Sequence, residues 1–199
     1  MSKLETNQVD PATGTTLTLG TSGDTIAIPS GVTIANSGTA TGFPANTPYF
    51  TARLGSDQDI GYTGTYTKIE IDTEYFDSAS AFDTSNYRFT PQTAGKYFVF
   101  GQCAFETTSG SNSGNNLVGL VTSIYKNGSN IVYQQIDRGG QLYSASKRTI
   151  GVSMIVDMNG SSDYLELYGM ANGNNAGSTR VTEAISDGGS IFGAYFLAT

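Results

Sequence analysis

The segment at residues 97–100, Tyr-Phe-Val-Phe, constrains the fold most, because all four of its side chains are apolar or aromatic. Successive side chains of a β-strand point to opposite faces, so Tyr97 and Val99 share one face and Phe98 and Phe100 the other. An antiparallel sheet commonly leaves one face to water. A strand that needs cover on both faces lies either centrally in a large fold or against another subunit. We favour the subunit contact, because no window of the sequence has helical periodicity that would supply a covering helix.

The residues before this segment predict a hairpin that leads into it. Asp83, Ser85 and Asn86 are turn formers whose side chains bond to nearby backbone groups. Tyr87 and Phe89 then alternate with polar residues, as in a half-buried strand.

Composition predicts an all-β chain of short strands joined by polar turns. The 199 residues include 25 Gly, 12 Tyr and 10 Phe, and only 14% are charged. We expect strands near residues 49–53, 66–72, 87–90, 96–105, 117–126, 130–136, 147–157, 163–171 and 190–198. Asn127-Gly128 predicts one hairpin and Asn159-Gly160 another. Nine or ten strands in this length suit a jelly-roll sandwich.

Charge and residue usage exclude several functions. A net charge of −7 argues against a basic face for nucleic acid. The chain has no His, the usual general base and metal ligand, and no Trp. We interpret the single cysteine, Cys103, as a small buried apolar residue. No apolar run is long enough to span a membrane, and the first residues do not resemble a secretion signal.

Residues 1–46 differ from the rest and form a separate N-terminal arm. They have no aromatic residue before Phe43, but they repeat a short unit in which two apolar side chains share a face. The three units are Leu17 with Leu19, Ile26 with Ile28, and Val32 with Ile34. We call these units rungs. Their apolar side chains can be buried only if the rungs stack in a solenoid or wrap around copies from other chains. The alternative is a disordered linker; we favour the rungs, and we predict domains at 1–46 and 47–199.

The order of motifs from residue 49 to residue 199 resembles the globular domain of the C1q and tumour-necrosis-factor superfamily. The matching segments are IEID from Ile69, FDTSNYRFTPQTAGKYFVF from Phe82, SIYKNGSNIV from Ser123, RTIGVSMIVDMNGSSDYLELYG from Arg148 and GSIFGAYFL from Gly189. The resemblance implies a homotrimeric, ligand-binding C1q/TNF-like jelly roll behind an extended β-rung arm. We assign the trimer interface to Tyr97, Phe98, Val99, Phe100, Phe192 and Tyr195.

The arm resembles the opening of tail-fibre and other virion structural proteins of tailed phages, particularly phages of marine cyanobacteria. Its short Thr-rich rungs ahead of a head domain carry the resemblance. This implies a virion protein made in the host cytoplasm. It also implies that Leu17, Leu19, Ile26, Ile28, Val32 and Ile34 anchor the chain to other virion proteins.

Candidate chemistry is sparse, which favours binding over catalysis. Glu70, Asp72 and Glu74 alternate along one predicted strand face, and residues 157–163 are rich in oxygen ligands. Either group has the ligand type that Ca²⁺ prefers, but a solvated face and ordinary turn chemistry explain them better, so we expect no metal and no cofactor. Asp57, Asp59, Glu70 and Asp72 are candidate carboxylate pairs for glycoside hydrolysis, but their separation is not in the sequence.

Polar loops are the better recognition candidates, because loops on a rigid sandwich commonly bind ligands. The loop residues we assign are Ser109, Asn112, Asn115, Asn116, Tyr143, Asn172, Asn174 and Asn175. The alternative is that these loops are tolerated insertions.

Three functions follow from these observations. The first is a non-enzymatic trimeric fibre whose head binds a host-surface glycan or protein. The second is a decoration protein that stabilises the capsid or tail. The third is a polysaccharide-degrading spike enzyme. None of them requires nucleic acid or membrane insertion.

Overall fold

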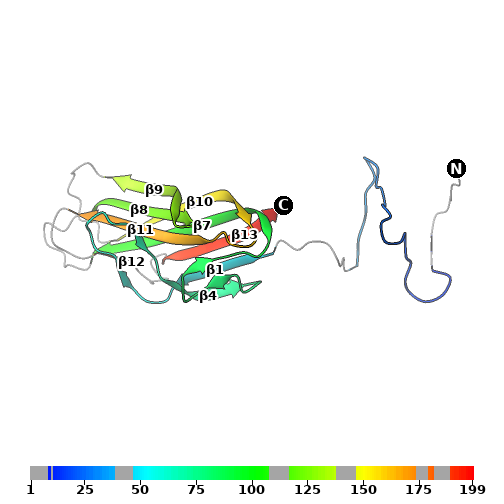
Figure 1. The fold of residues 1–199 in the computed structure, drawn as a ribbon, viewed down its shortest axis with the longest axis horizontal. Helices are drawn as coiled ribbons and strands as arrows, with labels where there is room; N and C mark the ends of the chain where they lie inside the picture. The colour runs from blue at the N-terminus through cyan, green and yellow to red at the C-terminus, as the bar shows by residue number, and fades with distance from the viewer. Residues whose placement is uncertain are drawn as a thin grey trace. The chain divides into compact units, whose positions relative to one another are not determined.

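The computed structural model describes residues 9, 11–38, 47–107, 117–137, 147–173, 179–181 and 189–199. The chain divides into two compact units, Met1–Phe43 and Pro44–Thr199, and each is described by itself. We call the second unit the head. Among its described residues, all regular secondary structure is β-strand (Figure 1). Within those residues no helix is long and apolar enough to cross a bilayer.

In the described residues, thirteen strands form two antiparallel sheets. They are β1 (Tyr49–Leu54), β2 (Gln58–Asp59), β3 (Thr67–Lys68), β4 (Ile71–Asp77), β5 (Phe82–Asp83), β6 (Arg88–Phe89), β7 (Ala94–Thr107), β8 (Leu117–Lys126), β9 (Ser129–Asp137), β10 (Lys147–Asn159), β11 (Leu165–Gly173), β12 (Thr179–Val181) and β13 (Ile191–Ala198). Sheet A has the order β2-β12-β7-β13-β1-β4, with β10 paired to the other edge of β7. Sheet B has the order β5-β6-β11-β8-β9, with β3 also paired to β11.

The long strand β7 organises sheet A. It pairs with β10 along almost its whole length on one edge, and with β13 and then β12 on the other. The strongly apolar sequence of β7 therefore lies at the centre of the sheet, where side chains on both faces have neighbours on two adjacent strands.

Aromatic rings fill the core between the two sheets. Phe50 stacks on Phe82 at 4.6 Å and on Phe89 at 4.5 Å between ring centroids, and it meets the edge of Phe192 at 5.2 Å. Tyr97 is fully buried beside Phe89 and donates a hydrogen bond to the Thr93 carbonyl. Burial raises the pKa of Tyr97 to about 12.

The assignment of Tyr97, Val99 and Phe192 to a trimer interface is wrong. All three are completely buried within the core of a single chain. The reason is the two-residue period of the strand, which sends Tyr97 and Val99 inward and leaves only Phe98 and Phe100 on the outer face. On β13 the same alternation sends Phe192 inward, while Tyr195 is exposed.

Two predicted turns are confirmed. Phe82 pairs with Phe89 and Asp83 with Arg88, which closes the hairpin of β5 and β6. The Asp83 carboxylate accepts hydrogen bonds from Ser85 and Asn86, which lower its pKa below the ordinary range. Asn127 and Gly128, at φ values of 52° and 76°, form the tight turn between β8 and β9.

The predicted second hairpin, at Asn159-Gly160, is wrong. The two strands that it connects, β10 and β11, belong to different sheets and do not pair with each other. An Asn-Gly pair sets the local turn, but only longer-range packing decides whether the chain returns in the same sheet or crosses to the other.

Side-chain hydrogen bonds explain the oxygen-rich segment at residues 157–163. The Asn159 carbonyl oxygen Oδ1 accepts hydrogen bonds from the backbone N–H groups of Ser161, Ser162 and Asp163. Asp163 in turn accepts from Asn127 at 2.8 Å and pairs with Lys126 at 2.8 Å. The segment therefore has the turn chemistry expected from its sequence, and it ties the β8–β9 turn to the crossing between the sheets.

Other parts of the strand prediction need adjustment. The single strand expected at 66–72 is two strands, β3 and β4, and β4 continues to Asp77. The two-residue strand β2 and the three-residue β12 were not predicted. Cys103 is buried as predicted, and desolvation raises the pKa of its thiol to about 12.

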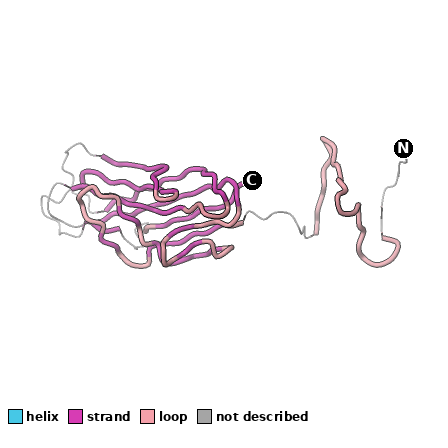
Figure 2. The backbone as a smooth tube through the Cα atoms, in the orientation of Figure 1, coloured by secondary structure: helices cyan, strands magenta, loops and turns pink. Residues whose placement is uncertain are grey.

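In the arm, the described residues 11–38 form extended segments joined by turns, with no strand among them (Figure 2). The turns fall between the predicted rungs: Asp24 N–H donates to the Thr21 carbonyl at 3.0 Å, and Val32 N–H to the Pro29 carbonyl at 3.2 Å. All six predicted anchoring side chains are exposed, from 44% for Leu17 to 71% for Ile34. Their role in anchoring stays a prediction.

Candidate functional site

An aromatic row crosses the outer face of sheet A. The strand register places Tyr49 opposite Tyr195, Tyr195 opposite Phe98, and Phe98 opposite Ile155. Phe76 of β4 extends the row, with its ring centroid 5.7 Å from that of Tyr49. We call the set Tyr49, Phe76, Phe98, Phe100, Ile155 and Tyr195 the phenylalanine face.

The phenylalanine face remains largely open to solvent in a single chain. Phe76 is 52% exposed, Ile155 56% and Tyr195 42%. A contiguous apolar surface of this kind is uncommon on a monomer and indicates an interaction site. Phe98, Phe100 and Tyr195 are the three predicted interface residues that the structure brings together here.

A glycine shapes the centre of this face. Gly193 lies opposite Phe100, and a side chain on Gly193 would collide with the end of the Phe100 ring. The Phe100 ring therefore lies over the Gly193 backbone instead of standing clear of the sheet.

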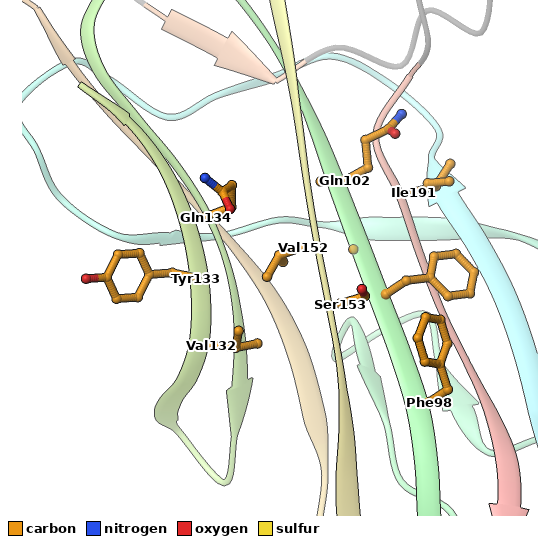
Figure 3. A pocket seen from close by; sticks show the side chains of 11 residues that line it. Phe98, Gln102, Val132, Tyr133, Gln134, Val152, Ser153 and Ile191 are labelled. Carbon is orange, nitrogen blue, oxygen red and sulfur yellow. The ribbon is translucent and has the colours of Figure 1, made fainter. Parts of the chain in front are cut away.

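An open groove of about 510 Å³ continues from the phenylalanine face across β10 to β9 (Figure 3). Phe98, Phe100 and Gln102 line one side, and Val132 and Gln134 line the other. Among the described residues, β10 pairs only with β7, and β9 only with β8. The groove therefore lies where each of the two sheets has a free edge strand.

A second aromatic surface lies on the outer face of sheet B, on the opposite side of the sandwich. Tyr125 and Tyr168 stack with ring centroids 3.9 Å apart, and Tyr66 lies 6.2 Å from Tyr125. Tyr164 packs under the Arg88 guanidinium, whose carbon lies 5.1 Å from the ring centroid. We call Tyr66, Tyr125, Tyr164 and Tyr168 the tyrosine face.

Three charged residues lie among these tyrosines. Lys68 pairs with Glu166 at 3.0 Å and also donates to the Asn86 carbonyl at 3.1 Å. Arg88 lies directly opposite Glu166 in the strand register, but makes no hydrogen bond or ion pair with any residue that the structure describes. Desolvation, followed by the negative charge of Glu166, raises the pKa of Tyr168. Desolvation is also the main cause of the raised pKa of Tyr125.

The predicted loop residues lie at one end of the head or outside the described residues. Ser109, Asn112, Asn115, Asn116, Tyr143, Asn174 and Asn175 all fall outside them. Asn172 is exposed near the end of β11 and bridges to Thr63. The strand ends that flank these loops lie together, since Lys147 pairs with Glu106 and Gly119 with both Asp137 and Asn172.

Asp72, which belongs to both the candidate metal group and the candidate carboxylate pairs, has a structural role. Asp72 accepts hydrogen bonds from Gly55 N–H and the Thr73 hydroxyl, so it stabilises a turn. No group of three metal-ligating side chains comes together within the described ranges.

The tyrosine face was missed by the sequence prediction. Part of its signal is present in the run 164–170, Tyr-Leu-Glu-Leu-Tyr-Gly-Met, where tyrosines alternate with buried leucines. The rest required the pairing of β11 with β8 and β3, which brings Tyr125 and Lys68 next to Tyr168.

Comparisons with known proteins identify similar folds among solved structures. No protein-family model matches the chain, and no curated protein matches it. Among solved structures, murine APRIL at pH 8.0 is similar with a TM-score of 0.52 at 8% identity, covering 75% of this chain and 98% of that one. Murine APRIL at pH 8.5 gives a TM-score of 0.51, with the same identity and coverage. The globular domain of zebrafish complement 1qA covers 76% of this chain at 8% identity, with a TM-score of 0.48.

These likenesses concern the fold alone. The two-sheet, all-β architecture of the head is a jelly roll of the C1q/TNF type, as predicted from the order of its motifs. The ligand and the assembly partners of the protein are therefore inferred from its own surfaces.

Proposed function

We propose that the protein is a non-enzymatic binding protein that assembles as a homotrimer through the phenylalanine face. The observation that carries the proposal is the row of Tyr49, Tyr195, Phe98 and Ile155 across four strands, left uncovered in a single chain. Burying it against other copies removes this apolar surface from water, at about 25 cal/mol per Å². Closed symmetric assembly also fits a jelly roll of this type.

We further propose that the protein is a phage virion component of the fibre or adhesion type. The support is the arm's resemblance to virion proteins together with its exposed apolar rungs, which need a partner. In this proposal the arm attaches to other virion proteins and the head binds a host-surface component.

The architecture of the head suits this role. The chain enters the head at the end where Pro48 accepts a hydrogen bond from Phe196 and β7 begins. The ends of β7, β9 and β11 that flank the polar loops lie at the other end (Figure 1). The strand ends that flank the polar loops therefore lie at the end of the head opposite Pro48.

Light scattering of the full chain at micromolar concentration tests the trimer. We expect three times the chain mass, and a stable monomer would contradict the proposal. Deletion of residues 1–42 should leave a folded, trimeric head but abolish incorporation into particles. Incorporation of the truncated chain would show that the arm is not the anchor.

Labelling this protein on intact particles separates fibre from decoration protein. We expect the label on an extended appendage, and adsorption to host cells should fall when residues 108–116 and 174–178 are shortened. A label on the capsid symmetry axes with unchanged adsorption would instead support the decoration role.

A further inference from the structure

The tyrosine face is large enough to hold an extended ligand. Arg88, Glu166 and Tyr125 lie opposite one another on three neighbouring strands, and Tyr164, Glu166 and Tyr168 follow one another along one face of the chain. From strand geometry the platform measures about 10 by 13 Å. Its centre, with Arg88, Tyr125, Glu166 and Tyr168, belongs to a sheet, and Tyr66 and Tyr164 each lie one residue before a strand.

Its chemistry is amphipathic. Tyrosine rings supply rigid apolar area at low cost in conformational entropy, and their hydroxyl groups donate and accept hydrogen bonds. Glu166 and Lys68 add a carboxylate and an ammonium group between the rings. Sugar rings match such a surface, because a pyranose has an apolar C–H face and a rim of hydroxyl groups.

Arg88 provides the charge preference. Its Nε is buried without a hydrogen-bond partner, and its guanidinium stacks on Tyr164 without an ion pair among the described residues. The neighbouring Glu166 is already neutralised by Lys68. Arg88 is therefore an unpaired cation on a protein of net charge −7, and a planar guanidinium is suited to bind a carboxylate.

We propose that the tyrosine face binds a carbohydrate chain that carries carboxylate groups, with sugar rings on Tyr125 and Tyr168 and a carboxylate at Arg88. One unpaired cation matches a glycan with widely spaced acidic sugars, because the net negative charge of the protein repels a densely charged polymer. The inference rests on the binding role proposed above and names the ligand class and the surface. It adds a recognition surface on a sheet face, apart from the polar loops.

The test is titration of the full chain with hyaluronate octasaccharide, in which acidic and neutral sugars alternate, followed by calorimetry and tyrosine fluorescence. The absence of Trp leaves tyrosine as the only strong emitter. We expect saturable binding, weakened at least 10-fold for the methyl ester of the same octasaccharide.

Variants assign the binding to the tyrosine face. Arg88→Gln and Tyr125→Ala should each weaken binding at least 10-fold. The matched controls Arg148→Gln and Tyr75→Ala remove an exposed arginine and an exposed tyrosine elsewhere, and should change affinity less than twofold. Tyr66→Ala, at the exposed rim, should weaken binding about threefold, and it tests the face even if Tyr125→Ala does not fold.

Three results would overturn the inference. The first is no binding of hyaluronate at millimolar concentration, and the second is equal affinity for its methyl ester. The third is that hexaglutamate binds at Arg88 and Tyr125 more tightly than hyaluronate does. Failure of glycan binding in an intact trimer would leave the proposed function standing. Glycan binding by a stable monomer would instead support the inference and contradict the proposed assembly.

Discussion

The two outer faces of the sandwich are both aromatic, but they differ in what surrounds the rings. On the phenylalanine face, Phe98 contacts Phe100 and Tyr195 at 6.3 and 5.3 Å between centroids, and Ile155 completes the row. On the tyrosine face, the rings alternate with Glu166, Lys68 and Arg88. The first is a surface that water wets poorly, and the second has polar partners for water or a ligand.

This difference separates two roles that aromatic content alone does not distinguish. An apolar face without charged groups among its named residues gains most from permanent burial against an identical face. A face with hydroxyl groups and an unpaired cation can remain in water and exchange ligands. We therefore expect substitutions on the phenylalanine face to change assembly, and substitutions on the tyrosine face to change binding.

The largest effect is expected at Phe192, for which the sequence predicts an interface role and which the structure places in the core. Phe192→Ala removes a ring packed against Phe50 and Phe82, and should lower the free energy of unfolding by about 3–5 kcal/mol. Urea unfolding measures it. Tyr133→Ala, at a 55% exposed tyrosine, is the control and should cost less than about 1 kcal/mol. Similar costs for both would contradict the division between core and surface.

The next effect is on assembly. Phe98→Asp places a charge at the centre of the phenylalanine face, and should raise the dissociation constant of the trimer at least 100-fold, because the charge would be buried without a partner. Light scattering over a concentration series measures the change. Tyr66→Asp on the tyrosine face is the matched control and should leave the mass unchanged. If Tyr66→Asp dissociates the protein and Phe98→Asp does not, the two faces have been assigned the wrong way round.

A smaller, pH-dependent effect is expected at the turn that connects the two sheets. Hydrogen bonds from Lys126 and then Asn127 lower the pKa of Asp163 in the folded protein. The stability that ionised Asp163 provides is therefore present above its unfolded pKa of about 3.9 and is lost as the pH falls through the folded value.

Asp163→Asn should lower the free energy of unfolding by about 1–3 kcal/mol at pH 7, with the difference from wild type shrinking below about pH 4. Urea unfolding at pH 7 and pH 3 measures both. Asp157→Asn is the control, because its ion pair with Lys96 is exposed and should contribute less than about 1 kcal/mol. A constant difference across this pH range would show that the charge of Asp163 is not the cause.

Local patterns in the sequence identified the elements of the head better than their partners. Alternation and turn residues located β7, β8 and the Asn127-Gly128 hairpin, because these depend on neighbouring residues. The crossing at Asn159-Gly160 was mistaken for a hairpin, and Phe192 for an interface residue, because sheet membership and the inward face depend on long-range pairing. The tyrosine face was missed for the same reason, since Tyr66, Tyr125 and Tyr168 lie on three strands far apart in sequence.

The smallest effect tests how finely the phenylalanine face is shaped. Gly193→Ala adds one methyl group that collides with the end of the Phe100 ring, and this flexible side chain can rotate away at little cost to the fold. The free energy of unfolding should therefore fall by less than about 1 kcal/mol, but the displaced ring would stand above the sheet and disturb packing between copies. We expect the dissociation constant of the trimer to rise about 3- to 10-fold, as measured by light scattering on dilution.

The control is the double variant Gly193→Ala with Phe100→Ala. If the displaced Phe100 ring is the cause, this variant should recover part of the lost trimer affinity. If the loss of trimer affinity in the double variant equals the sum of the losses in the two single variants, Gly193 acts independently of Phe100, and the position of the Phe100 ring does not control assembly.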